Sequence, residues 1–211
     1  MDNCNDWHYS ITLNQQDQLE NFMRARGYFG IGVEAISKPM NFGNLSRTAY
    51  GFNASFVFTV AAGKYVDVPQ SDTTRSQDHM PWYRFDSVED MRLPDDCHLV
   101  GVELVDDAIE LPSFRHPTRA AYVLGPEGGS LSPAMMEKCE FIVKIPTRFC
   151  VNVATAGAII MYDRVLSLGR FADRPVRAGG PTEPIEPHNH GKPLYEGARR
   201  LAPSKTRNRK I

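Results

Sequence analysis

The feature that most constrains the fold is the apolar stretch Tyr122–Leu168, which combines two short strand patterns with one long helix pattern. A first strand pattern, Tyr122–Leu124, leads into the glycine-rich turn Gly125–Gly129. A second strand pattern covers Phe141–Ile145, and the helix pattern covers Val151–Leu168. Open sheets of parallel strands bind ligands outside the carboxyl ends of their strands. The glycines of the turn also leave room for a ligand to approach the backbone. We therefore expect a ligand site where these loops meet.

The segments before this stretch also alternate between strand and helix patterns. Strand patterns rich in apolar residues occupy Phe29–Ile36, Ser55–Ala62 and His98–Leu104. An amphipathic helix pattern covers Phe42–Phe52, and a shorter helix is expected from Ser132 to about Cys139, with a proline at its first position. This alternation predicts an α/β fold, with a mostly parallel sheet that has helices on both faces.

Composition divides the chain into three parts: a polar N-terminal extension (1–28), a main domain (29–171) and a Pro/Gly-rich linker with a basic tail (172–211). From Arg170 onward, ten Lys and Arg residues accompany four Asp and Glu residues, although the whole chain has a formal net charge of −1. A basic arm on an acidic body suggests contact with a polyanion such as RNA. The same composition is as typical of a solvated, disordered tail.

The cysteine pattern indicates a reducing, cytoplasmic setting. The four cysteines form no C-x-x-C pair, and no secretory segment stands near the start of the sequence. No apolar run reaches the roughly 20 residues that span a bilayer, so we expect no membrane contact. The histidines lack metal-ligand spacing, so we expect no metal.

Two patches carry residues typical of ligand binding. Asn41 stands where the N-cap of a helix is expected and Arg47 follows six residues later, a combination that suits a phosphate or a ribose. Glu127 lies at the apex of the glycine-rich turn, where a carboxylate suits an amine, a hydroxyl or a main-chain group. Taken alone, each patch is more typical of ordinary structure: a capped helix with a surface arginine, and a turn with an exposed glutamate.

A third patch precedes the long helix. Cys150 lies just before this helix, a position that favours the thiolate. No histidine is close in sequence, so a small polar wall for a ligand is the favoured role over a nucleophile. Asn152 is expected to cap the helix.

Together, and in this order, the segments KPMNFGNLSRTA, YVLGPEGGSLS and IPTRFCVNVATAGAIIMYDR resemble the three motifs of the SPOUT superfamily, in its SpoU (TrmH) branch. The resemblance covers about residues 29–168. It implies S-adenosylmethionine-dependent methylation of ribose 2′-hydroxyls in tRNA or rRNA, without a metal. It also implies a deep trefoil knot at the C-terminal end of the domain, and a homodimer.

The resemblance assigns roles to individual residues. Arg47, Asn41 and Glu127 match catalytic positions, and Arg47 would also contact RNA. The expected donor-binding residues are Leu124, Gly125, Gly128, Ile145, Cys150, Val151 and Asn152. The basic tip is expected to add RNA contacts through Lys205, Arg207, Arg209 and Lys210. One departure stands out, because Cys150 replaces the serine of the family's Ser-Leu-Asn.

Three other functions compete with this one. Cys150 and the short third loop favour an RNA-binding protein with weakened catalysis. A SPOUT enzyme acting on a base nitrogen is disfavoured by the Asn–Arg pair of the first motif. A small-molecule nucleotide enzyme is disfavoured because no phosphate-loop signature is present.

Overall fold

The computed structural model describes residues 27–63, 66, 76–169, 171 and 174–180. The chain divides into two compact units, Met1–Arg170 and Phe171–Ile211. The described residues of the second unit form no helix or strand. Residues 1–26 and the basic tip lie outside the described residues, so the three-part division of the chain stays a prediction.

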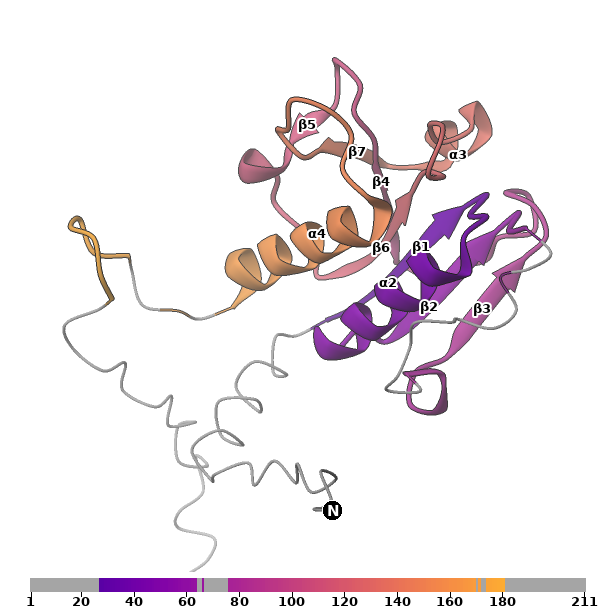
Figure 1. The fold of residues 1–211 in the computed structure, drawn as a ribbon, viewed down its shortest axis with the longest axis horizontal. Coiled ribbons are helices and arrows are strands. Elements are labelled where there is room, and N and C mark those ends of the chain that lie inside the picture. The colour runs from indigo at the N-terminus through magenta and orange to yellow at the C-terminus, as the bar shows by residue number, and fades with distance from the viewer. Residues whose placement is uncertain (1–26, 64–65, 67–75, 170, 172–173, 181–211) are drawn as a thin grey trace, which may run out of the picture. The chain divides into compact units, whose positions relative to one another are not determined.

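The first unit is an α/β structure (Figure 1). Its strands are β1 (Tyr28–Glu34), β2 (Phe56–Val60), β3 (Trp82–Phe85), β4 (His98–Val102), β5 (Ile109–Glu110), β6 (Arg119–Leu124) and β7 (Phe141–Lys144). Its helices are α2 (Pro39–Gly51), α3 (Pro133–Lys138) and α4 (Val153–Leu168), with 3-10 turns at Ser76–Asp78 and Leu111–Ser113. Within the described residues, seven strands form one sheet in the order β3-β2-β1-β6-β4-β7-β5, and every pairing is parallel. The predicted α/β class is confirmed.

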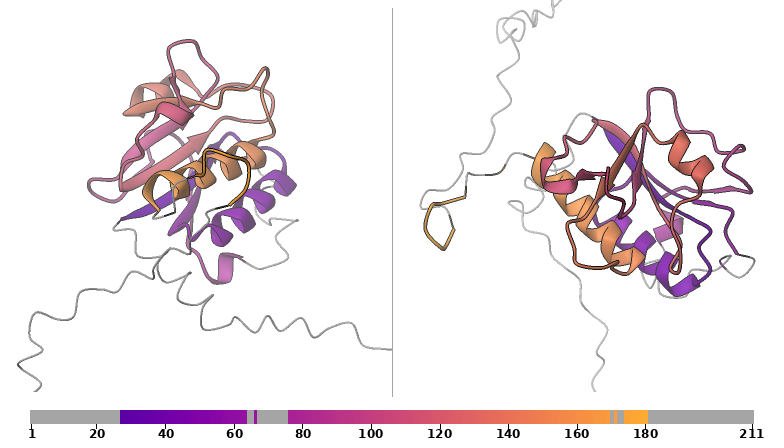
Figure 2. Two further views of the ribbon diagram at one scale, coloured as in Figure 1. Left: turned by 90° about the vertical axis from the view of Figure 1, so that its left-hand side faces the viewer. Right: turned by 90° about the horizontal axis from the view of Figure 1, so that it is seen from above.

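The helices cover both faces of the sheet. Helices α2 and α4 pack beside each other on one face, and α3 lies on the other (Figure 2). The first face buries, among others, Ile31, Val33, Phe42, Leu45 and Ile160, and the second buries Phe56, Phe58 and Met135. Strands buried on both sides explain why the strand segments are nearly continuous apolar runs.

Two helix starts follow their local sequence. At α4, the side-chain Oδ1 of Asn152 accepts hydrogen bonds from the backbone N–H of Ala154 (2.9 Å) and of Thr155 (3.4 Å). At α3, Ser132 Oγ accepts from the N–H of Met135 at 3.1 Å. Each cap satisfies donors that the first turn of a helix leaves unpaired. The predicted cap at Asn152 and the predicted start of the short helix are confirmed, whereas α4 begins at Val153, two residues after the predicted Val151.

The start of α2 differs from the prediction. Asn41 does not cap this helix, which begins at Pro39 with Lys38 as the N-cap residue and no side-chain cap. Proline favours the first helical position because its backbone angle is preset and it has no N–H to leave unpaired. Asn41 therefore lies inside the first turn, and its side chain makes other contacts.

The strand register brings three strand ends to one level. Leu124, the last residue of β6, pairs with Val33 of β1 on one side and with Val102 of β4 on the other. The segments that follow β1, β4 and β6 therefore leave the sheet side by side. In an open parallel sheet, ligands bind outside these carboxyl ends of the strands.

A buried polar network ties α4 to the sheet. Arg164 is 6% exposed, and its guanidinium donates to the Tyr122 hydroxyl at 3.0 Å and to the Pro117 carbonyl at 2.6 Å. His116 is 3% exposed, with Nδ1 2.6 Å from the Tyr122 hydroxyl and Nε2 2.9 Å from the Asp163 carboxylate. The Tyr122 hydroxyl accepts from Arg164, and its own proton finds an acceptor when it donates to Nδ1. This arrangement assigns the proton of a neutral imidazole to Nε2, which donates to Asp163.

Candidate functional site

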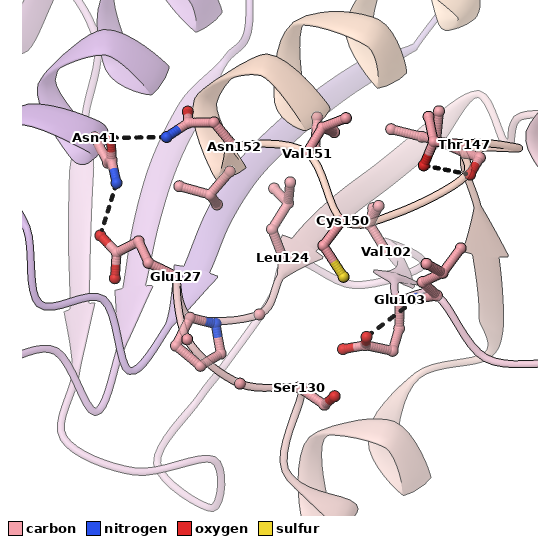
Figure 3. Close-up of a pocket in the computed structure, with 18 of the residues that line it drawn as sticks. Asn41, Val102, Glu103, Leu124, Glu127, Ser130, Thr147, Cys150, Val151 and Asn152 are labelled. Atoms are coloured by element: carbon pink, nitrogen blue, oxygen red, sulfur yellow. Dashed lines mark hydrogen bonds between the residues drawn. The ribbon is translucent and has the colours of Figure 1, made fainter.

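A pocket of about 550 Å³ lies at the carboxyl ends of the central strands (Figure 3). It is lined by the start of α2, the segment after β4, the glycine-rich turn after β6 and the loop between β7 and α4. Its volume falls in the range typical of small-molecule sites. All seven residues predicted to bind the donor line it, namely Leu124, Gly125, Gly128, Ile145, Cys150, Val151 and Asn152.

Glu127 ties the glycine-rich turn to the start of α2. Its Oε1 accepts from the Lys38 N–H at 3.2 Å and from the Asn41 side-chain amide at 3.0 Å. Its Oε2 accepts from the backbone N–H and the hydroxyl of Ser37, at 3.3 and 3.2 Å. Partial burial alone would raise the pKa of Glu127, but the hydrogen bonds from Asn41, Ser37 and Lys38 outweigh it and lower the pKa. The carboxylate is therefore held in its charged form.

Asn41 extends this contact to the third motif. Its Oδ1 accepts from the Asn152 side-chain amide at 3.1 Å, while its Nδ2 donates to Glu127. Asn152 in turn caps α4. The chain of contacts Glu127–Asn41–Asn152 joins the three motif segments, which are far apart in the sequence, into one frame on one side of the pocket (Figure 3).

Arg47 lies outside this frame. It is an exposed residue of α2 and does not line the pocket. In the described part of the chain, no hydrogen bond or ion pair holds its guanidinium. The Arg47 side chain thus lies at the surface and not among the residues that line the pocket.

Cys150 is exposed and lines the pocket. The loop before it is shaped by Thr147, whose hydroxyl donates to the carbonyl of Phe149 at 2.9 Å. By contrast, burial raises the pKa of Cys139 to about 12. The accessible thiol of the pocket is therefore that of Cys150.

Two further glutamates brace the loops at the strand ends, and the sequence did not single them out. Glu103 directly follows β4 and lines the pocket; its carboxylate accepts from the N–H of Leu131 at 2.8 Å and of Leu104 at 3.0 Å. Glu34 ends β1, is 4% exposed, and accepts from the N–H and hydroxyl of Ser132 at 2.8 and 2.6 Å. An acidic residue at the end of an apolar strand was the available signal for both.

A comparison with models of protein families identifies the family of this chain. The model of the SpoU rRNA Methylase family matches residues 29–162. The chain belongs to this family.

Individual members of the SpoU family are distant relatives. A putative TrmH family tRNA/rRNA methyltransferase of Staphylococcus aureus (strain COL) is 26% identical over 161 residues, which make up 72% of this chain and 62% of the relative. The chain therefore spans about three fifths of that relative's length.

Solved structures of SpoU and related proteins share the fold. The SpoU methyltransferase AviRb of Streptomyces viridochromogenes, in complex with the cofactor AdoMet, is 24% identical, with a TM-score of 0.59 over 71% of this chain and 63% of AviRb. Another solved structure, of a protein studied for the 2-OH methylation of C/U34 on tRNA, is 20% identical to this chain. The TM-score is 0.60, and the match covers 71% of this chain and 96% of that protein's chain.

Among the described residues of this SpoU-family chain, no helix has both the length and the hydrophobicity of a membrane span. No group of three or more His, Cys, Asp or Glu side chains in the same residues is placed to hold a metal ion.

Proposed function

We propose that this chain methylates a ribose 2′-hydroxyl of tRNA or rRNA with S-adenosylmethionine as the donor. The observation that carries the proposal is the frame Glu127–Asn41–Asn152, which joins the three motif segments beside one pocket. Membership in the SpoU family supports an RNA substrate. The 2-OH methylation of tRNA described for a structural neighbour supports the ribose hydroxyl as the target. The trefoil knot implied by the resemblance and a cytoplasmic setting belong to the same proposal.

The pocket suits such a donor. Its walls include the apolar side chains of Val102, Leu124, Ile145 and Val151, which fit a flat heterocycle. The turn supplies main-chain groups, and a Cβ placed on Gly125 would lie only 3.1 Å from the Leu131 nitrogen. When bound, the donor supplies an electrophilic methyl group on a sulfonium, which leaves as a neutral thioether. A residue larger than glycine at position 125 would crowd the Leu131 backbone and the Glu103 carboxylate beside the turn.

The residues of the chain would position the reacting ribose. Arginine is not deprotonated in proteins, so the proposed role of Arg47 is not that of the base. Its exposed guanidinium would instead hold the phosphate beside the target ribose and stabilise charge that develops on the 2′-oxygen, while phosphate or water takes the proton. Asn41 and Glu127 would hold the donor turn and the start of α2 in a fixed relation. Positioning of this kind contributes up to roughly 7–11 kcal/mol in favourable reactions.

Replacement of Arg47 tests the proposal. We expect Arg47→Ala to lower the rate of methyl transfer by at least about 100-fold, because a donor to the transition state is lost. Binding of S-adenosylhomocysteine should be unchanged, since Arg47 does not line the pocket. The measurements are transfer of labelled methyl groups to bulk tRNA and rRNA, and calorimetric titration.

The matched control is Arg115→Ala, which removes another exposed arginine, outside the three motif segments. It should methylate RNA like the wild type. Equal rates for Arg47→Ala and the wild type would contradict the role of Arg47.

A second candidate, an RNA-binding protein with weakened catalysis, is favoured by Cys150. A thiol is a weaker hydrogen-bond partner than the hydroxyl that the family usually has there. The same titration separates the two candidates. Binding near one site per chain supports the methyltransferase, and a folded chain that binds no donor supports the second candidate.

The proposed partners are RNA and a second copy of the chain. RNA contacts are assigned to Arg47 and to the basic tip, whose residues Lys205, Arg207, Arg209 and Lys210 lie outside the described part of the chain. A homodimer is expected from the resemblance.

A further inference from the structure

We propose that Glu103 recognises the sugar of the methyl donor by accepting hydrogen bonds from the 2′- and 3′-hydroxyls of its ribose. This inference rests on the proposed function. It concerns a residue outside the three motifs, and it assigns Glu103 to donor binding and not to the chemistry of transfer.

The two carboxylates that line the pocket, Glu103 and Glu127, differ in how many further hydrogen bonds they can accept. An ionised carboxylate offers about four acceptor positions, two on each oxygen. Glu127 has all four occupied, by Ser37, Lys38 and Asn41. Glu103 has one occupied on each oxygen, by the N–H groups of Leu104 and Leu131. Each oxygen of Glu103 thus keeps one position, and the pair matches a vicinal diol, which presents two hydroxyl donors side by side.

The place of Glu103 in the sheet supports a role at a ribose. It follows β4 directly, and β4 is the neighbour of β6, which leads into the glycine-rich turn. In dinucleotide-binding sheets, an acidic side chain near the glycine-rich turn holds the ribose hydroxyls of the ligand. Glu103 Oε2 lies against the same turn, 3.3 Å from where a Cβ on Gly125 would be (Figure 3). The pocket therefore combines a carboxylate for the ribose hydroxyls, the glycine-rich turn and apolar walls for the base, which are the features that a nucleoside site needs.

A purely structural role for Glu103 is the competing explanation, because it also braces Leu131. Glu34 provides the matched comparison. It accepts two hydrogen bonds from the next residue, Ser132, yet it does not line the pocket. A variant that only loosens this loop should have similar effects at either glutamate, whereas a lost ribose contact should appear at Glu103 alone.

The test is calorimetric titration of the full-length chain with S-adenosylhomocysteine and with its 2′-deoxy and 3′-deoxy forms. We expect the wild type to bind the deoxy forms about 10- to 100-fold more weakly, as for loss of a hydrogen bond to a charged group. Glu103→Gln should bind S-adenosylhomocysteine more weakly by a similar factor, and its discrimination against the deoxy forms should fall several-fold. Glu34→Gln should retain the wild-type discrimination. If Glu103→Gln does not fold, Glu103→Asp, with its carboxylate one methylene shorter, is used in the same cycle.

Two results overturn the inference alone: a wild type that binds all three ligands equally, or a Glu103 variant that discriminates as fully as the wild type. A folded wild type that binds no S-adenosylhomocysteine overturns the proposed function together with this inference. 5′-Methylthioadenosine, which lacks the amino-acid ammonium, should lose affinity in Glu103→Gln by the same factor. If Glu103→Gln loses affinity only for ligands that carry the ammonium, Glu103 contacts the ammonium and not the ribose, and the inference is overturned.

Discussion

Three glutamates hold the loops around the pocket, and their surroundings give each a different capacity. Glu34 is buried and holds the start of α3. Glu127 is saturated by donors from the α2 segment. Glu103 lines the pocket and accepts one hydrogen bond on each oxygen, from Leu104 and from Leu131. At the scale of the residue, the same side-chain type is therefore a buried brace, a link between motifs or a candidate ligand contact.

Cys150 offers a direct measure of donor binding. Its thiol is exposed in the pocket, whereas burial raises the pKa of Cys139 and of Cys97 and so disfavours their reactive thiolates. We expect iodoacetamide to modify Cys150 faster than Cys97 or Cys139. Saturating S-adenosylhomocysteine should slow the modification at least about tenfold by covering the thiol, as followed by mass spectrometry of the peptides.

The control for this labelling is S-inosylhomocysteine at the same concentration, an analogue with an altered base. Protection by both compounds alike would show poor selectivity for the base. An alkylation rate at Cys150 that S-adenosylhomocysteine leaves unchanged would contradict the proposed donor site.

At the scale of the element, the sequence was sufficient to predict a helix start where the capping side chain bonds within its own turn. Asn152 caps α4 as predicted, and Ser132 caps α3 at the predicted start of that helix, because each accepts from an N–H two or three residues ahead. The predicted cap at Asn41 was wrong because Pro39 starts α2 earlier. Strand β5 was not predicted, since two residues carry no periodicity.

The site needed contacts that the sequence does not show. The seven predicted donor residues line one pocket because the motifs follow strands whose ends the sheet brings together. Glu103 was missed because its partner Leu131 lies 28 residues further along the chain. Its capacity to bind a ligand follows from how many hydrogen bonds it already accepts, which only a structure provides.

The network that anchors α4 should make stability depend on pH. Burial lowers the pKa of His116 below its ordinary value of 6.5 and outweighs the opposing effect of Asp163. The unfolded chain therefore takes up a proton at a higher pH than the folded chain does. Stability should be fully present above pH 6.5 and should decline as the pH falls toward the lowered pKa, by at most about 1.4 kcal/mol per pH unit.

Urea unfolding from pH 7.5 to pH 5.5 measures this decline. His116→Gln has no imidazole to protonate, so its stability should be lower at pH 7.5 and should fall less over the same range. His98→Gln is the control, because His98 pairs with Glu140 at the surface and lies outside the network. Parallel pH profiles for His116→Gln and the wild type would contradict a neutral His116.

At the scale of the whole molecule, the outer side of α4 is the surface that suggests a partner. Tyr162 is 54% exposed, and Ile159 on the preceding turn is only partly buried. Exposed aromatic side chains such as Tyr162 are enriched at contacts between subunits. We therefore propose the outer side of α4 as the contact of the homodimer that the family resemblance implies.

Sedimentation should therefore give twice the mass of one chain for the wild type. Tyr162→Glu places a charge on this side of α4, and we expect it to shift the protein toward the monomer. Tyr83→Glu is the matched control, since Tyr83 is similarly exposed (51%) but lies on β3. A monomeric wild type, or a dimer that Tyr162→Glu leaves intact, would count against this interface.

The position of β6 between β1 and β4 has a consequence for synthesis on the ribosome. When residues 28–102 have emerged, β1 is already made, but the edge that later pairs with residues 119–124 has no partner. The nascent chain therefore presents an open apolar edge until the central strand arrives, a state prone to wrong pairings. The strand that joins β1 to β4 is also the one that leads into the glycine-rich turn, so the pocket cannot begin to form before β6 is made. Its last wall, the loop between β7 and α4, is made later still.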